Sequence, residues 1–206
     1  ITGINAEINI VLNNHSPCDP GQKVSGNMTI TTIGTDNITN ITFDLSDLVS
    51  DSNIIGKGNI TIATTYPFNL SVNETKVVLF NVAVSSHRYP GAYTATIRVN
   101  FTKNSTTSSI NKGLIVTVNS KPGLSITTPS LTTNPDKEKN VTFTVTNTGN
   151  IDLNSISVSI DSTELVDDDG DEISVEFNKS GFSLKAGESE IITAIVKTDE
   201  GLDLGT

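Results

Sequence analysis

An acidic stretch in the second half of the chain holds the residues best suited to chemistry. It reads DSTELVDDDGDEISVE, with carboxylates alternating at Asp167, Asp169 and Asp171 and a further one at Glu172. Ca²⁺ requires several hard oxygen ligands that converge on one cation. The full calcium-loop motif is not met, because its glycine comes too early and its closing glutamate falls on Asn178. Two interpretations stay open: a Ca²⁺ site built from these four carboxylates, and an acidic hairpin tip without metal.

Residues that could support catalysis are sparse. His15 and His87 are the two histidines, and each stands in a turn-like segment without a nucleophile or second ligand at a matching spacing. The sequence contains no phosphate-cradling glycine loop and no nucleophile elbow. Cys18 is the single cysteine, so no internal disulfide can form. We therefore expect a non-enzymatic protein.

A larger set of residues points to modification. The N-glycosylation tripeptide Asn-X-Ser/Thr occurs eleven times, whereas random placement of the same residues gives about five. Polar strand faces produce Asn-apolar-Thr triplets by themselves, because residues two apart share one face, and this alternative stays open. Glycosylation requires a secretory route, so the expected location is extracellular, at the cell surface. The expected acceptors are Asn14, Asn27, Asn37, Asn40, Asn59, Asn69, Asn73, Asn100, Asn104, Asn140 and Asn178.

Composition and charge narrow the class of protein. Ser, Thr, Asn, Val and Ile are abundant and Trp is absent, which suits strands better than helices. No apolar run approaches the roughly 20 residues that cross a bilayer, so we expect no direct membrane insertion. The net charge is −10. Residues 1–120 hold seven Lys/Arg and seven Asp/Glu, whereas residues 121–206 hold six and sixteen. Without a basic stripe, nucleic acid is not an expected partner.

An internal repeat organises the chain. Residues 20–46 align with residues 135–161 at a constant offset of 115, and their apolar positions coincide. Both segments show a period of two on either side of a glycine-containing turn, the pattern of two consecutive half-buried strands. The chain therefore contains two copies of one unit. The aligned pairs are Met28 with Phe143, Ile30 with Val145, Gly34 with Gly149, Ile41 with Ile156, Phe43 with Val158 and Leu45 with Ile160.

The alignment resumes further along the chain and sets the domain boundaries. At an offset of 114 it pairs Phe68 with Phe182, Leu70 with Leu184, Val77 with Ile191 and Gly91 with Gly205. The stretch Lys121-Pro122-Gly123 between the copies is a compact linker. We therefore place a first, sequon-rich sandwich at residues 1–119, a linker at residues 120–123 and a second, acidic sandwich at residues 124–206.

The spacing of apolar runs predicts the fold. Seven short strands separated by Gly, Pro, Asn and Asp indicate a two-sheet Greek-key sandwich of the immunoglobulin type. No stretch holds a 3.6-residue period for three turns, so no helix is expected. Tyr93 begins a strand and is expected to make a tyrosine-corner hydrogen bond. The predicted class is all-β, with two tandem immunoglobulin-like sandwiches. The strands of the first copy are expected near residues 4–12, 23–33, 38–46, 58–64, 76–84, 92–102 and 110–118.

Two segments of the second copy carry a family resemblance. NVTFTVTNTGNIDLNSISVSI and LKAGESEIITAIVKTDEGLDLGT resemble the tandem sandwich repeats of archaeal surface-layer (S-layer) and other secreted envelope proteins, including CARDB-type domains. The shared pattern places turns at residues 147–150 and 186–188, and the first copy carries it more loosely, with TTIGTDN and VNET. The resemblance implies structural spacers, envelope components and adhesins, with no catalytic residues.

These observations predict an N-glycosylated structural or adhesive component of an archaeal cell surface, either an S-layer-like protein or a filament subunit. The expected partners are further copies of the chain or neighbouring envelope subunits, held through strand edges and sheet faces. The alternative is a ligand-binding sandwich module of a larger secreted enzyme or receptor. A secreted hydrolase is a weaker alternative, because the sequence offers no catalytic constellation.

The alignment also predicts that the second copy is incomplete. Gly205 and Thr206 fall on Gly91 and Ala92, after which the first copy continues with two more strands. A sandwich without them is expected to expose a hydrophobic cleft and open sheet edges. Three explanations stay open. The chain is a fragment of a longer protein, or a neighbouring subunit donates strands, with residues 1–13 as the suggested donor, or the second copy is a degenerate cap.

Overall fold

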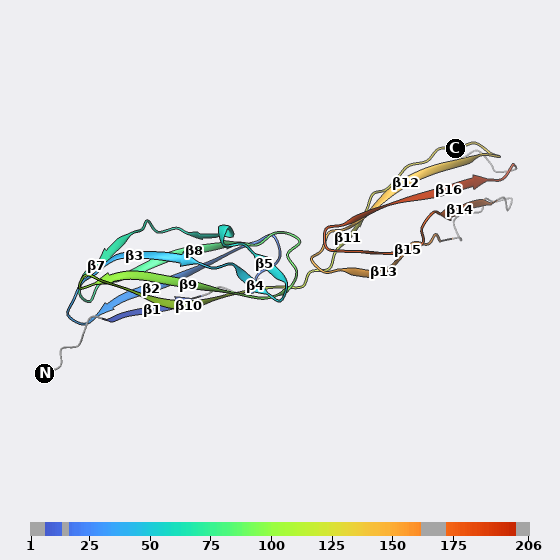
Figure 1. The fold of residues 1–206 in the computed structure, drawn as a ribbon. Helices are drawn as coiled ribbons and strands as arrows, with labels where there is room; N and C mark the ends of the chain where they lie inside the picture. Colours follow the sequence, from blue (N-terminus) through green and yellow to red (C-terminus); the bar gives the residue numbers. More distant parts are fainter. Residues whose placement is uncertain (1–6, 14–16, 162–171, 201–206) are drawn as a thin grey trace. The chain divides into compact units, whose positions relative to one another are not determined.

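A computed structural model describes residues 7–13, 17–161 and 172–200 and divides the chain into two compact units (Figure 1). Unit 1 comprises Ile1–Lys121, and unit 2 comprises Pro122–Thr206. The described residues form antiparallel sheets, with one short 3-10 turn, η1 (Lys57–Asn59), and no α-helix. The all-β prediction is confirmed. None of the helical segments in the described ranges has the length and apolarity of a membrane span.

Unit 1 consists of two sheets with an apolar core between them. One sheet has the order β1-β2-β8-β6, and the other has the order β5-β4-β9-β3-β7, with β10 also paired to β9. The strands are β1 (Glu7–Asn13), β2 (Lys23–Ile33), β3 (Ile38–Leu45), β4 (Leu48–Ser50), β5 (Asn53–Ile55), β6 (Ile60–Ile62), β7 (Phe68–Leu70), β8 (Thr75–Ala83), β9 (Gly91–Lys103) and β10 (Thr106–Val118).

The strands of unit 1 form because their apolar residues recur at every second position. In β9 the buried residues are every second one from Tyr93 to Phe101, while the Thr, Arg and Asn between them are more exposed. Successive side chains of a strand point to opposite faces of the sheet, so this pattern supplies one apolar face. The apolar faces of both sheets meet in a single buried cluster that includes Met28, Phe80 and Ile97.

The sequence-based strand positions in unit 1 are correct to within a few residues, but three strands were missed. β4, β5 and β7 have three residues each, which is too short for a period of two to stand out. The predicted strand at residues 4–12 is observed as β1, and its first residues lie outside the described part.

Tyr93 fixes the start of β9. Its hydroxyl donates a hydrogen bond to the backbone oxygen of Tyr89 over 2.8 Å, and its side chain is fully buried. The predicted corner hydrogen bond is confirmed. Burial raises the pKa of the Tyr93 hydroxyl above its usual value near 10, and the neighbouring Arg88 partly opposes this rise.

Replacing Tyr93 by phenylalanine should lower the free energy of unfolding of unit 1 by about 1.5 kcal/mol, because a buried hydrogen bond is lost. The pKa is raised in the folded state, so the contribution of this hydroxyl is complete below about pH 10 and is lost as pH rises further. Denaturant titrations at about pH 7 and pH 10.5 should therefore show a smaller alkaline loss in Tyr93→Phe than in the wild type. Equal losses would contradict this role.

Unit 2 repeats the first sheet of unit 1. Its larger sheet has the order β11-β12-β16-β14, and β13 pairs with β15 in a separate sheet. β11 and β12 pair as β1 and β2 do, and β16 lies between β12 and β14 as β8 lies between β2 and β6. The strands are β11 (Leu124–Ile126), β12 (Glu138–Asn147), β13 (Leu153–Ser157), β14 (Ile173–Phe177), β15 (Gly181–Leu184) and β16 (Ser189–Thr198).

The turn before the β8 and β16 strands is built alike in both units. The Glu74 carboxylate accepts a hydrogen bond from the backbone N–H of Ser71 over 2.7 Å, and the Glu188 carboxylate accepts one from the N–H of Lys185 over 2.9 Å. These residues are related by the offset of 114 that the sequence alignment predicts. The internal repeat is therefore confirmed in the hydrogen bonds of the backbone as well as in the strand order.

Candidate functional site

The two units differ most in the pairing of their second sheets. In unit 1, β3 pairs with β7 along one edge and with β9 along the other. In unit 2, β13 pairs with β15 along the corresponding first edge. Among the described residues, no strand pairs with the other edge of β13. An open edge presents a row of backbone donors and acceptors that can pair with another strand.

The register shows that β13 is the counterpart of β3. Ile41 lies opposite Phe68 in unit 1, and Ile156 lies opposite Phe182 in unit 2. Each strand has a register shift directly before this residue. The residue at the shift has a left-handed backbone in both units, with φ of 53° at Asn40 and 60° at Ser155. The open edge of β13 is therefore the edge that β9 covers in unit 1.

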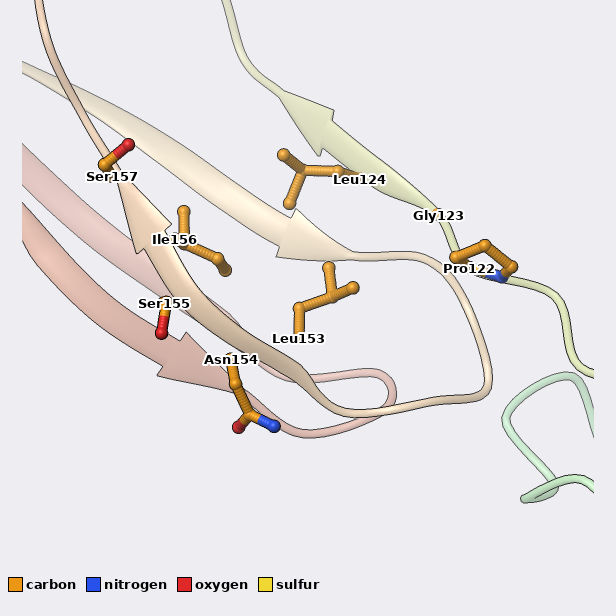
Figure 2. A pocket seen from close by; sticks show the side chains of 8 residues that line it. All are labelled: Pro122, Gly123, Leu124, Leu153, Asn154, Ser155, Ile156 and Ser157. Carbon is orange, nitrogen blue, oxygen red and sulfur yellow. The ribbon is translucent and has the colours of Figure 1, made fainter.

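An open groove of about 500 Å³ lies along this edge. Figure 2 shows Leu124 of β11 on one side and Leu153 and Ile156 of β13 on the other, with their side chains directed toward the space between the two strands. No charged residue lines the groove. Its lining consists of Pro122, Gly123, Leu124, Leu153, Asn154, Ser155, Ile156 and Ser157.

The apolar residues beside the groove are exposed where their counterparts in unit 1 are buried. Ile10 lies opposite Ile30 and is 3% exposed, whereas Ile126 lies opposite the equivalent Val145 and is 57% exposed. Ile156 is half-buried, but Ile41 is completely buried. Ile126 was not among the residues predicted from the sequence. Its place opposite a residue that aligns with Ile30 was the signal that could have identified it.

The predicted calcium ligands lie mostly beyond the structural description. Asp167, Asp169 and Asp171 are outside the described residues. Glu172 is exposed, and its backbone N–H donates to the Asp199 carboxylate over 3.3 Å. Within residues 7–13, 17–161 and 172–200, no three His, Cys, Asp or Glu side chains gather into a group that could hold a metal. The calcium site stays a prediction.

The predicted glycosylation sites lie mainly at the surface. Asn14 is outside the described residues, and Asn27 and Asn100 are half-buried. An exposed asparagine satisfies the geometric requirement for an attached glycan, so the structure is compatible with modification at most of these positions. The exposed acceptors are Asn37, Asn40, Asn59, Asn69, Asn73, Asn104, Asn140 and Asn178.

At three of these positions the conformation of the backbone itself favours asparagine. Asn40, Asn73 and Asn104 have φ values of 53°, 59° and 46°. Asparagine adopts this left-handed region more readily than most residues. At Asn104 the side-chain amide also donates to the Asp36 carboxylate over 3.0 Å. The left-handed backbone therefore accounts for asparagine at these three positions whether or not they carry a glycan.

The cysteine and both histidines of the chain belong to unit 1. Cys18 is buried, and burial, followed by the charge of Asp19, raises the pKa of its thiol. The thiol therefore stays protonated at neutral pH. His87 is exposed in a turn before β9, and His15 is outside the described residues.

Comparisons with known proteins identify no family. No protein-family model matches the chain, and no curated protein matches it. A family 123 glycoside hydrolase from Clostridium perfringens is similar in structure with a TM-score of 0.45 and 14% identity, over 56% of this chain and 27% of that one. The chain therefore spans about a quarter of that protein.

Two further solved structures show similar but weaker likeness. A protein of unknown function from Porphyromonas gingivalis W83 has a TM-score of 0.38 and 11% identity, over 92% of this chain and 83% of that one. The CsuC-CsuE chaperone-tip adhesion subunit complex of Acinetobacter baumannii has a TM-score of 0.38 and 10% identity, over 89% and 88%. Likenesses of this size assign neither a family nor an activity.

Proposed function

We propose that this chain is a non-enzymatic structural or adhesive component of a cell surface, built from tandem immunoglobulin-like Greek-key sandwiches. The observation that carries the proposal is the duplicated sheet: β11-β12-β16-β14 repeats the order of β1-β2-β8-β6. Proteins built by stacking copies of one sandwich extend a chain and present repeated surfaces and edges. The resemblance of both copies to the CARDB-type repeats of archaeal envelope proteins points to the same role.

Two features support the immunoglobulin-like assignment. The chain passes from the first sheet to the second between β2 and β3, returns for β6, crosses again for β7 and returns for β8. Repeated crossings between two sheets are typical of sandwiches with Greek-key connections. The hydrogen bond from Tyr93 to the backbone of Tyr89 lies at the start of β9, the position of the tyrosine corner in such sandwiches.

The native protein should carry glycans at exposed sequons, because a surface protein follows a secretory route. Peptides of residues 1–206 from the native source should be heavier by mass spectrometry than their amino-acid sequences alone give. Peptide mapping should place the added mass on acceptors such as Asn69 and Asn140. Asn154 is exposed but is not followed by the required Ser or Thr at the second position, so it serves as the internal control. Unmodified native peptides would contradict an N-glycosylated surface protein.

Electron microscopy of the native material tests the structural role directly. A lattice or fibre that contains this chain would support it, with further copies or neighbouring envelope subunits as partners. Isolated particles that bind a sugar or a protein through their loops would instead favour a ligand-binding module of a larger secreted enzyme or receptor.

A further inference from the structure

We propose that an N-linked glycan on Asn27 packs over an apolar patch on the outer face of the first sheet of unit 1. The patch consists of Val11, Val77 and Leu79, which are 47%, 52% and 53% exposed. The inference rests on the glycosylated surface role proposed above and states what one of its glycans does. The ligand is a saccharide bonded to the side-chain nitrogen of Asn27, and its first ring is the part that contacts the patch.

The register of the strands places the acceptor inside the patch. Asn27 on β2 lies directly opposite Leu79 on β8. Thr29, the third residue of the sequon, lies between Val77 on β8 and Val11 on β1 (Figure 1). Residues directly opposite each other in an antiparallel pair share one face of the sheet, with Cβ atoms about 5 Å apart. The residue between Asn27 and Thr29 is buried, so the sequon and the patch share the face that points away from the core.

The hydrogen bonding of Asn27 orients its amide. On the β1 side, the side-chain nitrogen of Asn13 donates to the Asn27 Oδ1 over 3.1 Å. The oxygen and nitrogen of an amide are bonded to the same carbon and point in different directions. An oxygen held toward β1 therefore leaves the nitrogen turned away from β1. β8, which carries Leu79, lies on the other side of β2, so a sugar attached to this nitrogen begins on the side of the patch.

A sugar ring has the chemistry that suits this patch. The faces of a pyranose ring present C–H groups that cover aliphatic side chains, while the hydroxyl groups at its edge stay hydrated. Covering exposed aliphatic carbon stabilises the folded state in proportion to the area removed from water. The same bulky, hydrated group also keeps other molecules away from the apolar residues. The glycan therefore both covers and shields the patch.

Unit 2 shows a similar arrangement. Asn140 on β12 is exposed and lies directly opposite Ile195 on β16, and these strands correspond to β2 and β8 in the sheet order. The offset of 115 places Asn27 on Thr142, so Asn140 stands two residues earlier. A shift of two residues keeps a side chain on the same face of its strand. In both units a sequon asparagine on the second strand of the sheet thus lies opposite an aliphatic residue.

Another sequon within a strand shows that strands do not produce this arrangement by themselves. Asn100 on β9 lies opposite Thr42 on β3 and Ser109 on β10, which are both polar. Its side-chain nitrogen donates to the Asp44 carboxylate over 2.7 Å. A sugar on Asn100 finds no aliphatic side chain at the directly opposite positions. Asn100 is therefore the matched control for Asn27.

The test measures how much glycosylation stabilises unit 1 in each variant. Residues 1–206 are produced in a glycosylating host and, without glycans, in the bacterial cytosol. Comparison of the two forms of one variant removes the effect of the substitution itself. Glycosylation should lower the equilibrium constant for unfolding of wild-type unit 1, and Asn27→Gln should diminish this decrease by about fivefold, because the apolar area is exposed again. Asn100→Gln should change it by less than about twofold. Equal effects of the two variants would overturn the proposal.

Substitutions in the patch distinguish contact from a general effect of the glycan. Leu79→Thr keeps the acceptor but removes aliphatic surface, so it should diminish the stabilisation by glycosylation about threefold. Ile115→Thr is its control, since Ile115 is 47% exposed on β10 and lies opposite Thr94, which belongs to no sequon. Nuclear Overhauser contacts should also link the first sugar ring to the methyl groups of Leu79. Absence of these contacts, or equal effects of Leu79→Thr and Ile115→Thr, would overturn the proposal.

These results are separable from the proposed function. Native material with glycans at other acceptors, such as Asn69, and an unmodified Asn27 would support the glycosylated surface role and overturn this inference. A sugar on Asn27 in contact with Leu79, in a protein that occurs as isolated particles, would support the inference and contradict the structural role.

Discussion

Replacing Ile38 by alanine should lower the free energy of unfolding of unit 1 by about 3 kcal/mol. Ile38 is completely buried, lies opposite Leu70 and belongs to the core cluster between the two sheets. Removal of its side-chain carbons costs the transfer free energy of those carbons and leaves a cavity, because β7 and β9 hold the strand on both edges. Denaturant titration of the unit 1 transition measures the loss.

The matched substitution in unit 2 should cost far less. Leu153 takes the place of Ile38 but is half-buried, because the edge of β13 beside it is open among the described residues. Leu153→Ala should therefore lower the stability of unit 2 by about 1 kcal/mol, since the lost side chain is already partly in water. Similar losses in the two units would show that the groove of unit 2 is covered in solution.

Gly26→Ala should destabilise unit 1 by about 3 kcal/mol. Gly26 lies opposite Phe80 in the β2–β8 pair. A Cβ at this position would approach the Phe80 ring to 2.3 Å and the backbone oxygen of Asn13 to 2.8 Å. Phe80 is 1% exposed, so its ring is enclosed by the core, and the ring or the backbone near Asn13 must shift. Thermal and denaturant unfolding of unit 1 should both report the loss.

Two variants control this prediction. Gly113→Ala places a methyl group on β10, where no atom lies within 4 Å, and should be neutral or slightly stabilising because alanine restricts the unfolded chain. Adding Phe80→Leu to Gly26→Ala removes the clashing ring atoms, so the double variant should lose less than the sum of the two single losses. An unaffected Gly26→Ala protein would contradict the packing described here.

The repeat and the positions of the longer strands could be predicted because they depend on local patterns. The period of two placed β2, β3, β8, β9 and β10 within a few residues. The alignment also matched Ile41 with Ile156 and Phe68 with Phe182. The structure places Ile41 opposite Phe68 and Ile156 opposite Phe182, so the aligned residues take equivalent places in the two units. These pairs are visible in sequence because each is an apolar residue on the inner face of a strand.

The groove was predictable only in part. A missing strand pair could be inferred from the alignment, but the walls of the resulting groove depend on which strands pair across the sheet. Leu124 stands in a three-residue strand, and nothing in its local sequence indicates that it lies across from Ile156. The glycosylation sites differ from the groove in this respect. Their motif is easily recognised in the sequence, but whether a glycan is attached depends on the compartment and not on the fold.

The late position of the β9–β10 hairpin in unit 1 has a consequence for protein synthesis. Ribosomes deliver the chain from the N-terminus, so β1 to β8 emerge before the strands that close the core. At that stage Ile38 and Ile41 lack the strand that covers them, in the way that Leu153 and Ile156 lack one among the described residues of unit 2. The described part of unit 2 thus resembles unit 1 at the stage of synthesis when its last hairpin has not yet emerged. At that stage a chaperone or a complementary strand has its best access to the apolar residues.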